Sequence, residues 1–177
     1  MAGPTHHILE TPKFDEPVKL LIVVSPYYKD VADNLIAGAK AQASSAGAEV
    51  ELIEVPGALE IPSAIRISMR QGDFDGFVAL GCIIRGETTH YETVCNDSSH
   101  GLMLLGLQGA NIGNGILTVE NHAQAAVRAD PADQNKGGGA AAAALHLIAL
   151  QRKYAGKTKG IGFRPFQDPD DGSFQIA

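Results

Sequence analysis

The segment GCIIRGETTHYETVC, residues 81–95, carries the densest group of reactive side chains in the sequence. Thr88 and Thr89 come at the start of a helix predicted over residues 89–107. The first amide groups of a helix lack backbone partners and lie at the positive end of its dipole, so a helix start binds phosphate readily. A threonine at this place can equally act only as the helix N-cap. The segment alone therefore indicates either a phosphate site or a cap.

His90 lies in the first turn of that helix, and a histidine can transfer protons near neutral pH. The position also suits a structural histidine. Cys82 as a thiol nucleophile with His90 as its base is a further alternative, although no third group that would orient the histidine is evident. The same stretch holds four candidate zinc ligands, namely Cys82, His90, Cys95 and His100. Their spacings match no zinc motif, so no metal is expected.

Further aromatic and polar residues follow the other predicted strands. Tyr27 and Tyr28 follow the first, Glu60 follows the second within PGALEIP, and Glu120 and Asn121 follow the fourth within TVEN. Ligands of open parallel sheets bind beyond the carboxyl ends of the strands. We therefore expect these residues to share one rim with the segment described above.

Arg128 and Lys136 supply two cations late in the chain. The planar guanidinium suits phosphate oxygens, so the two residues are candidates for a second anion-binding group. Each can equally be a solvated surface charge. The glycine patterns of two common nucleotide-binding loops, GxxxxGK[ST] and GxGxxG, are absent from the sequence.

Alternating strands and helices must position these residues. Strands are predicted at residues 20–24, 50–55, 77–80 and 116–117, and helices at 30–46, from 61 onward, and at 89–107, 124–129 and 138–154. This alternation predicts right-handed crossovers and a parallel sheet with helices on both faces, which is an α/β fold. Residues 20–24 form a continuous aliphatic run, typical of a strand buried on both faces.

The chain divides into three regions. Residues 1–18 contain three prolines and are expected to form an extended arm, residues 19–155 form one domain, and residues 156–177 are expected to form a mobile tail. Only 19% of the residues are charged, against about 25% in typical proteins. Part of the surface is therefore expected to be buried against other copies of the chain.

Composition and charge exclude several classes of protein. The net charge of −6 provides no basic surface for nucleic acid or an anionic membrane. Apolar stretches fall short of the ~20 residues of a membrane helix, and MAGPTHHILETPKF lacks the apolar core of a signal peptide. Two cysteines make no disulfide framework. A cytoplasmic enzyme or binding protein is expected.

Four motifs, PGALEIP, GCIIRGETTHYETVCNDSSHGL, NGILTVEN and QNKGG, closely resemble those of the lumazine synthase family, over nearly all of residues 19–154. The resemblance implies a flavodoxin-like three-layer sandwich around a four-stranded parallel sheet. It also implies the penultimate step of riboflavin biosynthesis. There, 5-amino-6-(D-ribitylamino)uracil condenses with 3,4-dihydroxy-2-butanone 4-phosphate to 6,7-dimethyl-8-ribityllumazine, with loss of phosphate and water. No metal and no organic cofactor are implied.

The resemblance also implies roles for individual residues. His90 matches the proton-transfer histidine, Tyr27 the ring that stacks on the pyrimidine, and Glu60 the carboxylate that accepts ribityl hydroxyl protons. The pyrimidine and ribityl group would contact Tyr27, Ala58, Leu59, Glu60, Cys82, Ile83, Ile84 and Asn114. The phosphate would contact Glu87, Thr88, Arg128 and Lys136.

The chain departs from the family pattern in three places. Asn114 stands where many relatives place a phenylalanine from the neighbouring subunit, and Tyr28 replaces a residue that is often polar. The turn RADPADQNKG has Asp130, Pro131 and Asp133 in place of the glycine-containing turn of relatives that form sixty-subunit shells. Proline fixes the local backbone and can change how the last two helices meet, so we expect a homopentamer or a pair of pentamers and not a shell. The resemblance implies that the active sites lie between adjacent subunits.

Two alternatives to an active synthase remain open at this point. A non-catalytic flavin-binding or lumazine-binding paralogue would keep the pocket, but would have less need of both His90 and Arg128. A flavodoxin-like electron carrier is disfavoured, because the first loop has no Ser/Thr-rich phosphate cradle and the predicted strands are too few.

Overall fold

Four parallel strands form the central sheet, in the order β2-β1-β3-β4. They are β1 (Lys19–Val24), β2 (Glu49–Glu54), β3 (Gly76–Ile84) and β4 (Ile112–Val119). The structure, a computed structural model, describes residues 9–155. Residues 1–8 of the expected arm and the expected tail at 156–177 lie outside this part of the chain.

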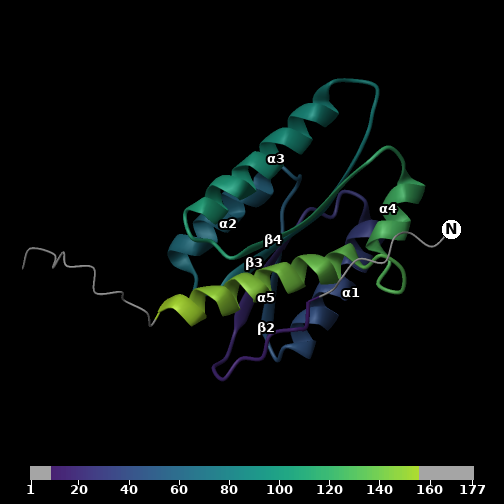
Figure 1. The fold of residues 1–177 in the computed structure, drawn as a ribbon. Coiled ribbons are helices and arrows are strands. Elements are labelled where there is room, and N and C mark those ends of the chain that lie inside the picture. Colours follow the sequence, from purple (N-terminus) through teal and green to yellow (C-terminus); the bar gives the residue numbers. More distant parts are fainter. Residues whose placement is uncertain (1–8, 156–177) are drawn as a thin grey trace, which may run out of the picture.

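Helices cover both faces of the sheet (Figure 1). One face carries α1 (Lys29–Ser45), α4 (His122–Ala129) and α5 (Lys136–Ala155), and the other carries α2 (Glu60–Gln71) and α3 (His90–Leu107). Successive residues of β1 point to opposite faces, so Leu20 and Ile22 pack in one core and Leu21 and Val23 in the other. The predicted α/β class and four-stranded parallel sheet are confirmed, as a three-layer fold.

Strand β3 is longer than predicted and continues to Ile84. Gly81 interrupts the aliphatic run of the sequence, but the strand passes through it and Gly81 pairs with Ile116 of β4. Cys82 and Ile83 therefore belong to the strand, and the prediction that it ends at residue 80 is wrong. Their backbone groups are held in register at the carboxyl end of the sheet.

Strand β4 spans eight residues, whereas only residues 116–117 were predicted. Two of its residues, Gly113 and Gly115, lack the side chains by which a strand pattern is recognised, so the first half of the strand was not predicted. The structure gives a reason for the first of them, since a Cβ at Gly113 would lie 1.8 Å from the carbonyl oxygen of Ala140 in α5. Asn114, between the two glycines, is consequently an exposed residue of an edge strand.

Residues 9–18 contain no helix or strand, and α5 holds the end of this segment. The Arg152 guanidinium donates to the carbonyl oxygens of Glu16, at 3.1 Å, and Pro17, at 2.8 Å. It also donates to Asp75 Oδ1 at 3.0 Å. These bonds tie the chain that enters β1 to the last helix.

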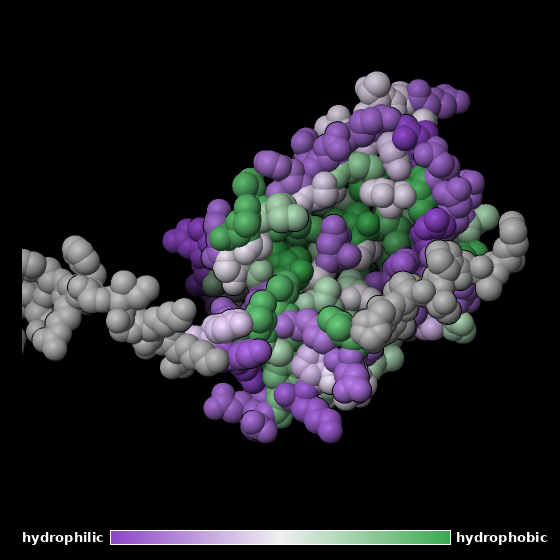
Figure 2. All heavy atoms as spheres, viewed as in Figure 1, coloured by the Kyte–Doolittle hydropathy of each residue, from purple (hydrophilic) through white to green (hydrophobic). Residues whose placement is uncertain are grey.

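An apolar hollow of about 580 Å³ lies between α3 and α5, along β4. Leu107, Met103 and Leu150 line it and have exposed fractions of 79%, 63% and 50%. Figure 2 shows hydrophobic side chains gathered on this side of the molecule. Single exposed apolar residues are ordinary, but a hollow lined by several of them is typical of a protein interface.

Within residues 9–155, no helix combines the length and apolar character required to cross a membrane. In the same residues, no three His, Cys, Asp or Glu side chains form a group that could hold a metal ion. Cys82 and Cys95 are free thiols.

Candidate active site

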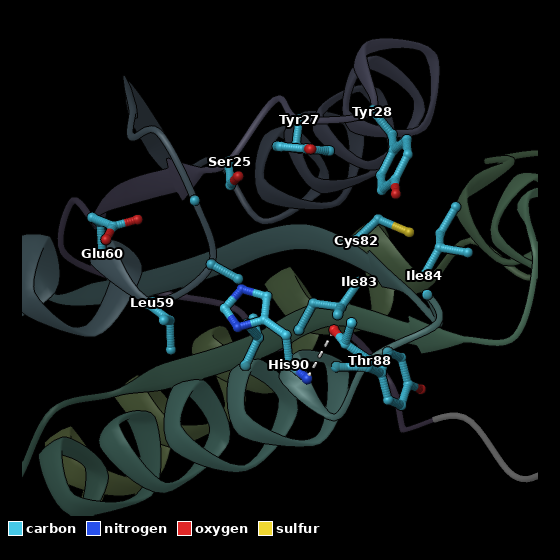
Figure 3. Close-up of a pocket in the computed structure, with 15 residues that line it drawn as sticks. Ser25, Tyr27, Tyr28, Leu59, Glu60, Cys82, Ile83, Ile84, Thr88 and His90 are labelled. Carbon is cyan, nitrogen blue, oxygen red and sulfur yellow. Dashed lines mark hydrogen bonds between the residues drawn. The ribbon is translucent and has the colours of Figure 1, made fainter.

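A cavity of about 420 Å³ opens at the carboxyl ends of the central strands, between the starts of α2 and α3 (Figure 3). This is where open parallel sheets bind ligands, and small-molecule sites typically measure roughly 300–1,000 Å³. The lining residues are Ser25, Tyr27, Tyr28, Gly57, Ala58, Leu59, Glu60, Cys82, Ile83, Ile84, Gly86, Thr88, His90, Tyr91 and Val94.

Most of the predicted site residues line this cavity. They are Tyr27, Ala58, Leu59, Glu60, Cys82, Ile83, Ile84, Thr88 and His90. Glu87 is exposed and is not among the lining residues. Five further lining residues were not predicted as site residues, namely Ser25, Gly57, Gly86, Tyr91 and Val94. Val94 could have been found from its spacing, because it lies four positions after His90 and residues so spaced share one face of a helix.

His90 is the first residue of α3, and its imidazole points into the cavity near Leu59 and Ile83 (Figure 3). Thr89, at the N-cap, forms no side-chain cap bond. Thr88 Oγ1 accepts only a long hydrogen bond, of 3.4 Å, from the His90 backbone N–H. The interpretation of these threonines as simple caps is therefore not supported. The helix start retains amide groups that can bind an anion.

Cys82 is nearly buried, with an exposed fraction of 9%. Burial, and to a lesser extent the negative charge of Asp30, raises the pKa of its thiol to about 11. The side chain therefore stays protonated near neutral pH, and a thiol is a much weaker nucleophile than a thiolate. Cys82 as a nucleophile with His90 as its base is disfavoured, and Cys82 instead contributes a wall of the cavity.

Two tyrosines form an aromatic corner of the cavity. Tyr27 is 75% exposed, and its ring meets the Tyr28 ring edge to face, with centroids 5.1 Å apart and planes at 69°. Tyr28 is half-buried against the core beneath α1, and burial raises the pKa of its hydroxyl. Tyr27 thus has an open aromatic face, which suits stacking on a planar ring.

Glu60, the first residue of α2, brings a carboxylate to another part of the cavity (Figure 3). A Cβ at Gly57 would lie 2.7 Å from Glu60 Oε2, so the glycine of PGALEIP leaves space for this carboxylate. Carboxylate oxygens accept hydrogen bonds from hydroxyl groups. The cavity therefore offers an aromatic face, a hydroxyl-binding carboxylate, a helix start for an anion and a histidine.

Asn114, Arg128 and Lys136 line a different cavity, of about 340 Å³, beside β4. The two cavities share no lining residue. Arg128 Nη1 donates to the carbonyl oxygen of Gln124 at 3.0 Å, and Asn114 Oδ1 accepts from the Ile116 N–H at 2.9 Å. One chain therefore divides the predicted phosphate ligands between two places, with Thr88 in the first cavity and the two cations in the second.

A family model described as 6,7-dimethyl-8-ribityllumazine synthase matches residues 17–152. The chain belongs to this family. A 6,7-dimethyl-8-ribityllumazine synthase of Jannaschia sp. (strain CCS1) is 53% identical over 165 residues, which cover 93% of each chain. Proteins of the same description are 56% identical over 137 residues in Novosphingobium aromaticivorans and 55% identical over 135 residues in Zymomonas mobilis subsp. mobilis. These two alignments cover 77% and 76% of this chain, and 99% and 97% of the relatives.

Membership of the 6,7-dimethyl-8-ribityllumazine synthase family confirms the resemblance that the sequence motifs indicated. The match extends from the residues before β1 to the last turns of α5. It therefore includes both cavities and every predicted site residue.

Proposed function

We propose that this protein is a transferase that forms 6,7-dimethyl-8-ribityllumazine from 5-amino-6-(D-ribitylamino)uracil and 3,4-dihydroxy-2-butanone 4-phosphate, in riboflavin biosynthesis. Family membership supports this activity. The observation that carries it is the position of His90, whose imidazole enters a cavity that also holds the Tyr27 ring and the Glu60 carboxylate.

The pyrimidine substrate fits the first cavity. The open face of Tyr27 stacks on its planar ring, and the backbone groups of Cys82, Ile83 and Ile84 bind the ring edge. Ala58 and Leu59 line the ribityl chain, whose hydroxyls donate to Glu60. In Figure 3, Glu60 and Leu59 lie at one side of the cavity and Cys82 and Ile84 at the other, which supports this orientation.

Proton transfer falls to His90. Condensation of the substrate amine with the ketone releases water and gives a Schiff base, and elimination of phosphate from that intermediate requires a proton to be removed from carbon. A single histidine that accepts and returns protons near neutral pH suits these steps. Much of the acceleration is expected to come from holding two substrates together.

Phosphate binding requires both cavities. The amides at the start of α3, near Glu87 and Thr88, supply one half of the proposed anion site, and Arg128 and Lys136 supply the other. Because the two cations line a separate cavity in the single chain, we propose that an adjacent subunit brings them to the first cavity. The apolar hollow between α3 and α5 supports such an interface.

The proposed assembly is a homopentamer or a pair of pentamers. The turn between α4 and α5 is closed by its own hydrogen bonds, from the Ala132 N–H to Asp130 Oδ1 at 2.8 Å and from the Asn135 N–H to the Asp130 carbonyl at 3.0 Å. Asn135 has a φ of 44°, a backbone conformation that asparagine tolerates. A turn fixed in this way supports a geometry different from that of the glycine-containing turn of shell-forming relatives.

We further propose that the protein works in the cytoplasm, where thiols such as Cys82 and Cys95 stay reduced. The proposed organisation is an arm at residues 1–18, the synthase domain at 19–155 and a tail at 156–177. No nucleic acid, membrane, metal or organic cofactor is needed by the proposed reaction.

The activity is tested by mixing the full chain with both substrates and following the absorbance of the lumazine product. Product that accumulates only when both substrates are present is the expected result. Flavin or lumazine binding without product would instead indicate the non-catalytic paralogue. The His90→Ala variant, assayed in parallel, controls for uncatalysed condensation.

A further inference from the structure

We propose that Arg85 is a positioning residue, which holds the loop at residues 85–89 and the start of α3 in the arrangement that binds the phosphate substrate. This inference rests on the proposed function and adds to it a residue that does not line the cavity.

Arg85 joins the ends of three elements. Its backbone N–H donates to the Val119 carbonyl at 2.9 Å, directly after the paired part of β3 and β4. Its guanidinium Nε donates to Glu120 Oε2 at 2.8 Å, just beyond β4, and its Nη1 donates to Glu92 Oε1 in the first turn of α3. One planar side chain therefore ties the end of the sheet to the start of the helix.

The same guanidinium reaches a wall of the cavity. Its central carbon lies 4.1 Å from the centroid of the Tyr91 ring, and Tyr91 lines the cavity next to His90. Stacking of arginine on an aromatic ring restricts the orientation of both groups. Arg85 thus limits the movement of a cavity residue from outside the cavity.

The loop has little packing of its own. Its residues are exposed, and a Cβ at Gly86 would meet no atom within 4 Å. The long bond from the His90 N–H to Thr88 Oγ1 is a weak constraint. The position of the loop amides therefore depends on how its two ends are held, and Arg85 connects both ends.

Arg85 is unsuited to binding phosphate directly. Two carboxylates already accept from its guanidinium, and the hydrogen bond from Arg85 lowers the pKa of Glu92, which keeps that carboxylate charged. The ion pairs of Arg85 with Glu92 and Glu120 are also not needed for folding, because exposed ion pairs contribute little to stability. The side chains of Arg85, Glu92 and Glu120 are 40%, 49% and 57% exposed. The loss of Arg85 should therefore affect binding of the phosphate substrate and not the stability of the fold.

The test compares the parent protein with Arg85→Gln, Arg85→Lys and the double variant Glu92→Gln/Glu120→Gln. Glu51→Gln is the matched control, since Glu51 pairs with Lys19 at 2.6 Å with a similar exposed fraction of 54% and lines no cavity described above. Steady-state kinetics give kcat and a KM for each substrate. Calorimetric titration of the full chain with inorganic phosphate gives an affinity that needs no turnover, and thermal melting checks folding.

We expect Arg85→Gln and the double variant to raise the KM for the phosphate substrate and the Kd for inorganic phosphate by about three- to tenfold. The KM for the pyrimidine substrate should change by less than about twofold, and Glu51→Gln should match the parent. Arg85→Lys should recover only part of the loss, because an ammonium group cannot bond both carboxylates in one plane.

Unchanged phosphate affinity in folded Arg85→Gln would overturn the inference, as would equal increases in both KM values. A parent protein that forms no lumazine would instead refute the proposed function. In that case the calorimetric phosphate affinities of the same variants still decide the role of Arg85.

Discussion

Gly137 of α5 lies so close to Leu35 of α1 that a Cβ at position 137 would be 2.1 Å from the Leu35 carbonyl oxygen. The neighbouring Gly138 is buried as well, whereas a Cβ at Gly139 would meet no atom within 4 Å. The run of small residues that begins α5 therefore allows two helices to approach with their backbones in contact.

We expect Gly137→Ala to lower the free energy of unfolding by about 1–3 kcal/mol, because the added methyl group forces the two backbones apart. Gly139→Ala, two residues further along the same helix, is the control and should be neutral or stabilising by up to about 1 kcal/mol. Urea unfolding at one fixed protein concentration measures both. Equal effects of the two substitutions would contradict the packing argument.

His90→Ala should fold normally and lower kcat by on the order of 10²-fold or more, because general acid–base catalysis typically contributes 10²–10⁴-fold. Binding of the pyrimidine substrate should change little. Stopped-flow or steady-state measurement of lumazine formation, with circular dichroism to confirm folding, checks this. A kcat equal to that of the parent would leave His90 with a structural role only.

Arg128→Ala should mainly weaken binding of the phosphate-bearing substrate, through loss of a guanidinium that suits phosphate oxygens. We expect its Kd to rise by at least about tenfold, since hydrogen bonds to charged groups contribute about 1.5–3 kcal/mol. Arg66→Ala, an exposed arginine on α2 that lines neither cavity, is the matched control. Substrate affinity at the parent value in Arg128→Ala would show that this arginine is not a phosphate ligand.

Cys82 should resist alkylation. With a pKa of about 11, roughly one thiol in a thousand is ionised at pH 8, against about a quarter of free cysteine with a pKa of about 8.5. Iodoacetamide should therefore modify Cys82 about 200-fold more slowly than free cysteine, as measured by mass spectrometry of the peptide. Modification at the rate of free cysteine would mean that the thiol is ionised and the cavity wall more polar than the structure indicates.

The raised pKa of Cys82 also makes the free energy of unfolding depend on pH in the alkaline range. The folded-state pKa of Cys82 lies above that of the unfolded chain, so on raising the pH the unfolded chain loses its proton first. The contribution of this thiol to stability is complete below about pH 8 and declines between about pH 9 and pH 11. Urea unfolding across this range should show a smaller decline in Cys82→Ala than in the parent.

Light scattering should give a particle of five or ten times the 18.5 kDa chain mass. The turn at residues 130–135, closed on the Asp130 side chain and carbonyl, is the feature behind this expectation. A particle near megadalton mass would contradict it and would show that this turn permits a sixty-subunit shell.

Sequence patterns predicted the layers better than the ends of the strands. Aliphatic runs such as residues 20–24 are typical of buried parallel strands, because both faces need apolar side chains. The full lengths of β3 and β4 were not predicted, because Gly81 and Gly113 lack the side chain that carries a strand pattern. At Gly113 the reason for the glycine is a close approach to the backbone of Ala140, which only the folded structure shows.

The candidate site was also predicted only in part from the sequence. Tyr27, Glu60, Thr88 and His90 of the first cavity were predicted because they follow strands whose carboxyl ends meet at one edge. Ala58, Leu59, Cys82, Ile83 and Ile84 were predicted only through the family resemblance. The separation of Arg128 and Lys136 from His90 within one chain could not be predicted from order along the sequence, since it depends on which side of β4 the last two helices lie.

The two separate cavities also have a genetic consequence. Suppose that each working site joins His90 of one subunit to Arg128 of the next. In a ring of identical mutant subunits, a mutation of either residue then removes one of these two groups from every site and leaves the other group intact. A mixed ring of His90→Ala and Arg128→Ala subunits then contains some contacts with both defects and some with neither. Two alleles that are each inactive alone would complement one another in the same cell, which residues of a site confined to one chain cannot do.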